Sequence, residues 1–222
     1  MTPVVVVADD LAAEAKARFL AAARAALAAS GRCRVALSGG STPKALYEAL
    51  GPADLPWPDV ELFYGDERRV PLDDPRSNHR MVTEALLGRV PVACHPLVDA
   101  DAYEALLRDR LGPEGAFDVM LLGIGEDGHT ASLFPGSPAL AERARWVVAA
   151  PGVAPAPERL TLTPPVLQAA RQVLVFVGGA GKAGVLQAVL EGPPGRYPIQ
   201  LLGAAQGEVT WVVDRAAAAL LA

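Results

Sequence analysis

Short runs of apolar residues recur along the chain and are separated by polar or amphipathic stretches. Continuous apolar runs of this length are typical of strands that are covered on both faces of a sheet. The runs that predict strands are residues 4–7, 34–37, 60–64, 117–122, 146–149, 160–163, 173–177 and 209–213.

Helices are predicted between these strands. Residues 11–29 are rich in alanine and place apolar side chains at helical spacing, with Asp9 or Asp10 as the N-cap and Ser30-Gly31 as the end. Further helices are predicted from about residue 43 to 50, at 78–87, 101–111 and 183–190, and in the alanine-rich segment after residue 213.

Strand, glycine-rich loop and helix follow one another repeatedly. This order predicts an α/β fold with a doubly wound, mostly parallel sheet and helices on both faces, a Rossmann-like three-layer arrangement. No linker, low-complexity tract or repeat interrupts it, so we expect one domain over residues 1–222. Ligands of such sheets bind beyond the carboxyl ends of the strands, and the polar loops of this chain lie at those ends.

Composition excludes several classes of protein. The chain is 51% hydrophobic with a net charge of −5, which excludes intrinsic disorder and argues against a nucleic-acid partner. Cys33 and Cys94 are too few for a disulfide framework or a cysteine zinc site, and we interpret both as small buried side chains. Without a recognisable signal peptide or spanning segment, the chain is expected to be cytoplasmic, with no membrane partner.

The first candidate loop follows the strand at 34–37. Gly39 and Gly40 let backbone N–H groups approach a ligand, and the free N–H groups of the next helix start form an anion site. The hydroxyl groups that add donors are those of Ser38, Ser41 and Thr42. This loop predicts a phosphate site, while an ordinary N-cap at its serine or threonine would give the same pattern.

The loop at 178–182 repeats this order of strand, glycines, lysine and helix. It is not a nucleotide P-loop, because Ala183 replaces the required Ser or Thr and Phe176 replaces the first glycine. The chain has only three lysines, and two of them lie beside glycine-rich helix starts. We therefore interpret Lys182 as an electrostatic partner of an anion rather than a solvated surface residue.

The loop at 123–128 matches the dinucleotide pattern G-x-G-x-x-G, but prolines interrupt the helix that a nicotinamide or flavin site requires. Its Asp127 and His129 suggest acid–base chemistry instead, because a carboxylate can orient an imidazole and stabilise its protonated form. His79 and His95 have no comparable setting and are interpreted as structural or surface residues.

A fourth loop at 65–69 joins two carboxylates to two guanidinium groups. Asp66 and Glu67 can orient sugar hydroxyls or a catalytic base, and Arg68 can bind a phosphate, although a solvated charge cluster is the simpler interpretation. The chain has neither a G-x-S-x-G nucleophile elbow nor an H-E-x-x-H metal motif.

Taken together, the blocks at 38–43, 65–68, 125–135, 159–163 and 181–182 resemble the glucosamine-6-phosphate deaminase/6-phosphogluconolactonase family, and the lactonases in particular. The resemblance implies a cytosolic hydrolase of the pentose phosphate pathway. Such an enzyme converts 6-phospho-D-glucono-1,5-lactone to 6-phosphogluconate without a metal or an organic cofactor.

The deaminases of this family carry a catalytic Glu five residues after the histidine, where this chain has Phe134, and read Met-Asp-Glu-Tyr where this chain has Gly-Asp-Glu-Arg. The chain therefore follows the lactonase pattern at both points. A deaminase or isomerase of sugar phosphates and a non-catalytic sugar-phosphate sensor are the alternatives.

The resemblance suggests a division of roles among the loops. The 6-phosphate is expected on residues 38–42, with Lys182 and with either Arg68 or Arg159. His129 is expected to activate water. Asp127 or Asp66 would orient its ring. The expected partner is a phosphorylated sugar lactone, no metal is required, and the oligomeric state is open, with a monomer compatible.

Overall fold

A central sheet of seven strands organises the computed structural model, which describes residues 3–51, 53–152 and 158–222. Its strand order is β1-β10-β9-β6-β2-β3-β5, and every neighbouring pair is parallel. The strands are β1 (Val4–Ala8), β2 (Cys33–Leu37), β3 (Val60–Tyr64), β5 (Ala93–Cys94), β6 (Val119–Gly123), β9 (Gln172–Val177) and β10 (Glu208–Asp214). The predicted doubly wound α/β fold is confirmed.

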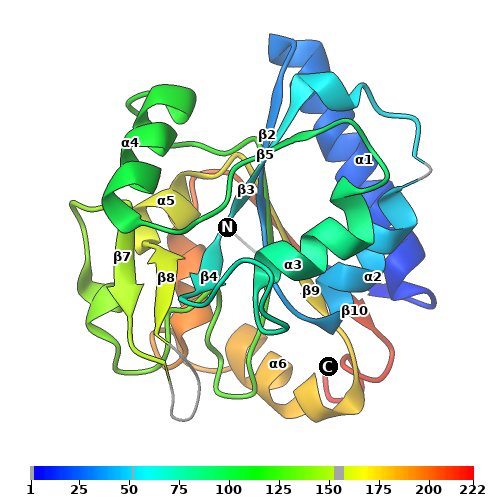
Figure 1. The fold of residues 1–222 in the computed structure, drawn as a ribbon. Coiled ribbons are helices and arrows are strands. Elements are labelled where there is room, and N and C mark those ends of the chain that lie inside the picture. The colour runs from blue at the N-terminus through cyan, green and yellow to red at the C-terminus, as the bar shows by residue number, and fades with distance from the viewer. Residues whose placement is uncertain (1–2, 52, 153–157) are drawn as a thin grey trace.

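Helices cover both faces of this sheet, which Figure 1 shows nearly edge-on between them. On one side α1 and α2 contact each other and the central strands, and α4 and α5 lie on the other side. The helices are α1 (Leu11–Ser30), α2 (Ser41–Leu50), α3 (Asn78–Val82), α4 (Ala100–Leu111), α5 (Pro164–Ala169) and α6 (Ala183–Leu190). Short 3₁₀ segments are η1 (Trp57–Asp59), η3 (Pro138–Ala141), η4 (Ala180–Lys182) and η5 (Pro198–Ala204), and η2 (Thr83–Leu87) is a π-helical turn that extends α3.

A second, antiparallel sheet of three strands lies beside α4 and α5 (Figure 1). It consists of β4 (Asp66–Arg68), β8 (Arg159–Leu162) and β7 (Val147–Ala150). The sequence predicts β7 and β8 but treats residues 66–68 as a loop. Pairing with β8, almost a hundred residues later, makes this charged segment a strand.

Two further predictions are wrong. The strand β1 is not buried on both faces: it lies at the edge of the described sheet, next to β10, and its Val4 and Val7 are 45% and 50% exposed. The segment 215–220 forms turns instead of a helix. The six residues are too few to offset the cost of helix nucleation by propensity alone, and Ala217 is buried in the core in the turn conformation.

The strand order places four neighbouring carboxyl ends at one edge of the sheet. Residues that follow β9, β6, β2 and β3 form the four candidate loops, and the parallel pairing brings them to the same side. In the described part of the chain, no helix combines the length and the apolar character needed to cross a membrane.

Candidate active site

The loop after β2 presents an uncapped helix start. Gly40 is the N-cap of α2, with φ +106°, and no side chain caps the helix there. Ser41 and Thr42 are therefore the first two helical residues rather than N-caps. Because no side chain accepts from them, the first N–H groups of this helix are available to an anion.

Two neighbours fix the shape of this loop. The backbone N–H of Ser38 donates to the Tyr47 hydroxyl at 3.0 Å, and that hydroxyl donates back to the Ser38 carbonyl at 2.8 Å. Gly39 has no room for a side chain, because a Cβ there would lie 2.1 Å from Asn78 Oδ1. The buried Asn78, which donates to the Asp66 carbonyl at 2.9 Å, therefore packs directly against this loop.

The two carboxylates after β3 have different surroundings. Glu67, 2% exposed, accepts from the backbone N–H groups of Asn78 and His79, both at 2.7 Å, so it caps the buried start of α3. Asp66 accepts from Ser132 Oγ at 2.5 Å and lies 3.7 Å from Arg159 Nη1. Glu67 is thus a structural cap, whereas Asp66 joins two of the candidate loops.

His129 is held by its own loop. The ring Nδ1 lies 2.5 Å from Asp127 Oδ1, and the His129 backbone N–H donates to the same oxygen at 3.2 Å. Gly125 faces this pair so closely that a Cβ would lie 2.0 Å from Nδ1. Among the described residues, Asp66 makes no hydrogen bond with the His129 ring; its carboxylate accepts from Ser132 instead. The structure therefore favours Asp127 as the carboxylate that orients the ring.

The charge of Asp127 determines which ring nitrogen can act. Partial burial would raise the pKa of Asp127, but hydrogen bonds from the His129 ring and backbone outweigh it and hold this pKa below its usual value of 3.8. An ionised carboxylate only accepts, so the proton of a neutral His129 ring lies on Nδ1. The lone pair of Nε2 is then available as a base.

Phe134 lies between the histidine and a partly buried cation. Its ring centroid lies 4.5 Å from that of His129 and 5.3 Å from the guanidinium carbon of Arg159. Burial lowers the pKa of Arg159, with the Asp66 charge opposing the shift, and the group stays protonated at neutral pH. The sequence pointed to Phe134 only as the residue that replaces a carboxylate.

The loop after β9 adjoins two of the others. Gly178 lies against α2, since a Cβ there would be 3.6 Å from Thr42 Oγ1, and a Cβ at Gly181 would be 3.8 Å from Glu126 Oε1. The Gly179 N–H donates to Asp214 at 2.8 Å. In the described part of the chain, no carboxylate lies within ion-pair distance of Lys182, which ends η4 and is half-buried.

Unpaired polar atoms are concentrated in these loops. Of six buried side-chain polar atoms without a partner in the described residues, four belong to the candidate site: Ser38 Oγ, Arg68 Nε, Thr130 Oγ1 and Arg159 Nε. Leaving such a group unpaired costs about 1–3 kcal/mol, so a concentration of them is typical of a site for a polar ligand. Thr130 carried no signal in the sequence beyond its place after His129.

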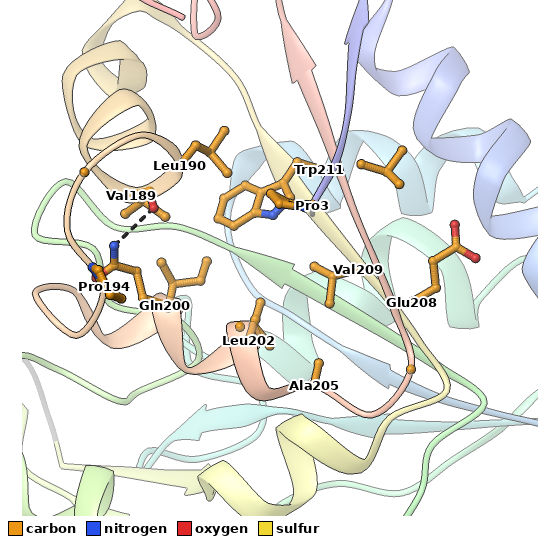
Figure 2. Close-up of a pocket in the computed structure, with 15 residues that line it drawn as sticks. Pro3, Val189, Leu190, Pro194, Gln200, Leu202, Ala205, Glu208, Val209 and Trp211 are labelled. Atoms are coloured by element: carbon orange, nitrogen blue, oxygen red, sulfur yellow. Dashed lines mark hydrogen bonds between the residues drawn. The ribbon is translucent and has the colours of Figure 1, made fainter. Parts of the chain in front are cut away.

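An apolar pocket of about 240 Å³ lies at the opposite edge of the sheet (Figure 2). It is beside the first residues of β1 and β10, and Leu190, Leu202 and Trp211 are among its lining residues. The four candidate loops contribute nothing to it, so it is separate from the site. Over residues 3–51, 53–152 and 158–222, no cluster of three or more His, Cys, Asp or Glu side chains is arranged to bind a metal ion.

Comparison with known proteins defines the class. A family model described as glucosamine-6-phosphate isomerases/6-phosphogluconolactonase matches residues 7–211. The 6-phosphogluconolactonase of Synechocystis sp. is 41% identical over 209 residues, or 86% of each chain, and that of Mycobacterium tuberculosis is 38% identical over 96% of this chain and 95% of its own. The chain belongs to the glucosamine-6-phosphate isomerase/6-phosphogluconolactonase family.

Within that family, the structural comparison again leads to a lactonase. The solved 6-phosphogluconolactonase of Trypanosoma brucei aligns over 99% of both chains with a TM-score of 0.87 and 32% identity.

Proposed function

We propose that this chain hydrolyses 6-phospho-D-glucono-1,5-lactone to 6-phosphogluconate. The observation that carries this proposal is the Asp127–His129 pair, which leaves Nε2 as a base and has Phe134 beside it instead of a second carboxylate. Lactone hydrolysis needs one base and stabilisation of an oxyanion, whereas an aldose–ketose proton relay needs a further ionisable group. The lactonases among its relatives support the same reaction.

In the proposed reaction, Nε2 of His129 takes a proton from water as the water oxygen bonds to the lactone carbonyl carbon. The carbonyl oxygen becomes an oxyanion. When it reforms the carbonyl, the bond to the ring oxygen breaks and protonated His129 returns its proton to that oxygen. The product is an open-chain acid, which releases its own proton to solvent. Asp127, kept ionised by its lowered pKa, stabilises the transient imidazolium.

The substrate phosphate is proposed to bind at the start of α2. The helix N-terminus, the unpaired Ser38 hydroxyl and the ammonium of Lys182 supply donors and positive charge there. Arg68 and Arg159 are the two candidates for a second cation, because each has an unpaired buried Nε. Binding the remote phosphate positions the lactone ring and lowers the barrier at the carbonyl.

The decisive experiment compares hydrolysis rates of freshly made lactone with and without protein, after subtraction of spontaneous hydrolysis. His129→Ala should lower kcat by about 10²–10⁴-fold while the protein stays folded. A near-normal rate would exclude His129 as the base. Ammonia release from glucosamine-6-phosphate would point to a deaminase, and ligand binding without turnover to a sensor.

The phosphate assignment has its own test. Lys182→Ala should raise KM for the phosphorylated lactone far more than for an unphosphorylated lactone. Lys16→Ala, a lysine within α1, is the matched control and should change neither value. Equal losses on both substrates would refute the assignment.

A further inference from the structure

A strained turn connects His129 to Phe134. The Leu133 N–H donates to the Thr130 carbonyl at 3.0 Å and closes the turn, and Ala131 within it has φ +48°. It is the one non-glycine residue of the described chain with a positive φ. An L-residue with a Cβ is disfavoured in that region, so other contacts must hold the turn in place.

Ser132 supplies those contacts. It is fully buried, its hydroxyl donates to Asp66 Oδ2 at 2.5 Å, and its backbone N–H donates to Thr161 Oγ1 at 3.2 Å. The Thr161 hydroxyl itself donates to the Leu162 carbonyl at 3.0 Å, so its lone pairs face Ser132. The side chain and the backbone N–H of Ser132 are therefore both fixed by hydrogen bonds.

The two anchors form one rigid unit. Asp66 and Thr161 are directly paired neighbours in β4 and β8 of the small sheet. The Asp66 carboxylate is also engaged by Arg159 Nη1 at 3.7 Å and by Asn78 Nδ2 at 3.4 Å. We call Ser132, Asp66 and Thr161 the Ser132 clasp.

We propose that Ser132 and Asp66 are positioning residues for His129. The clasp holds Ala131 in its strained conformation, and that conformation places Phe134 beside the His129 ring, with ring centroids 4.5 Å apart and planes inclined by 41°. Asp66 thus acts on the histidine through the turn rather than by direct contact. This inference rests on the proposed role of His129 as the base.

Ser132→Ala is the first test, because it removes one hydroxyl and adds no volume. The kcat for the lactone should fall about ten- to a hundredfold, the range expected when a catalytic group is displaced by up to an ångström. KM should change less than kcat, since the clasp makes no contact with residues 38–42. Arg159, whose Nη1 lies 3.5 Å from the Ser132 hydroxyl, keeps its contact with Asp66 in this variant. The NMR shifts of the His129 ring protons should also change, because they report the ring current of Phe134.

The matched control is Ser137→Ala. Ser137 is also buried, belongs to the same loop and accepts one hydrogen bond, from the Ala139 N–H at 3.3 Å, but it lies outside the clasp. This variant should keep kcat and the His129 shifts. Similar losses in both serine variants would mean a merely structural role and would overturn the proposal.

Ala131→Asn provides the rescue, because asparagine tolerates positive φ better than alanine. In the double variant with Ser132→Ala, part of the lost kcat and the His129 shifts should return. If the kcat of the double variant equals the product of the two single-variant effects, the proposal is contradicted. It is also contradicted if the His129 ring protons of Ser132→Ala keep the NMR shifts of the unmodified protein. If the unmodified protein hydrolyses no lactone, the proposed function fails, and the NMR shifts alone decide whether the clasp positions His129.

Discussion

Gly125→Ala should lower kcat about a hundredfold although it alters no catalytic group. The new Cβ would lie 2.0 Å from His129 Nδ1 and 2.5 Å from Asp127 Oδ1, and contacts under 3.0 Å essentially do not occur. The imidazole must therefore retreat by about 1 Å, a displacement that costs about 10²-fold in rate. This equals about 2.7 kcal/mol of activation free energy. The φ of Gly125 is not in the left-handed region, so the backbone itself accepts alanine.

The assay follows acid release from fresh lactone at constant pH and yields kcat and KM separately. KM should stay nearly unchanged, because the new methyl group is directed at the acid–base pair. Gly184→Ala in the exposed part of α6 is the control, since no atom lies within 4 Å of its Cβ. It should keep kcat and gain up to about 1 kcal/mol in stability from helix propensity. A Gly125→Ala enzyme with kcat within threefold of the parent would refute the reasoning.

Three further outcomes are expected. Glu67→Gln should lower the free energy of unfolding in urea by about 1–3 kcal/mol, because a buried carboxylate that accepts the N–H groups of α3 is lost; an unchanged urea midpoint would contradict this. Burial lowers the pKa of His79 below 6.5, against the raising effect of Glu67, so protonation favours the unfolded chain and stability should fall as the pH drops below about 6.5. His79→Asn should reduce that fall between pH 7.5 and 5.5, and an identical slope would exclude His79 as its source. Dialysis against a chelator should leave kcat within about twofold, since the proposed route uses no metal; loss restored by a divalent ion would contradict it.

Much of the fold could be predicted because apolar runs identify strands covered on both faces. Once the sheet is parallel, the carboxyl ends of its strands meet at one edge, so the four loops had to lie near one another. The sequence left Asp127 and Asp66 as alternative partners of the His129 ring. The structure pairs the ring with Asp127, which two residues of separation within a tight glycine-rich loop keep in reach.

The remaining features depend on contacts between distant segments. Glu67 looked like a member of a charged site, and its role as the cap of α3 appears only when residues 77–79 fold back onto it. Residues 66–68 have no apolar alternation, and only their pairing with β8 makes them a strand. Ser132 lies inside the most specific sequence block, but nothing in the sequence shows that its hydroxyl is buried against Asp66.

The position of β1 has a consequence for synthesis of the chain. In the described sheet this strand has β10 as its one neighbour, so its partner is the last of these strands to be made. Two hundred residues separate Ala8 from Glu208, which takes about 10–40 s at a translation rate of about 5–20 residues per second. Throughout that interval the segment Val4–Ala8 is unpaired. Uncharged segments of high β-propensity are prone to aggregate when they are exposed in this way. A ribosome that pauses before β10 therefore prolongs the exposure of β1, so chaperone demand should depend on translation speed late in the message.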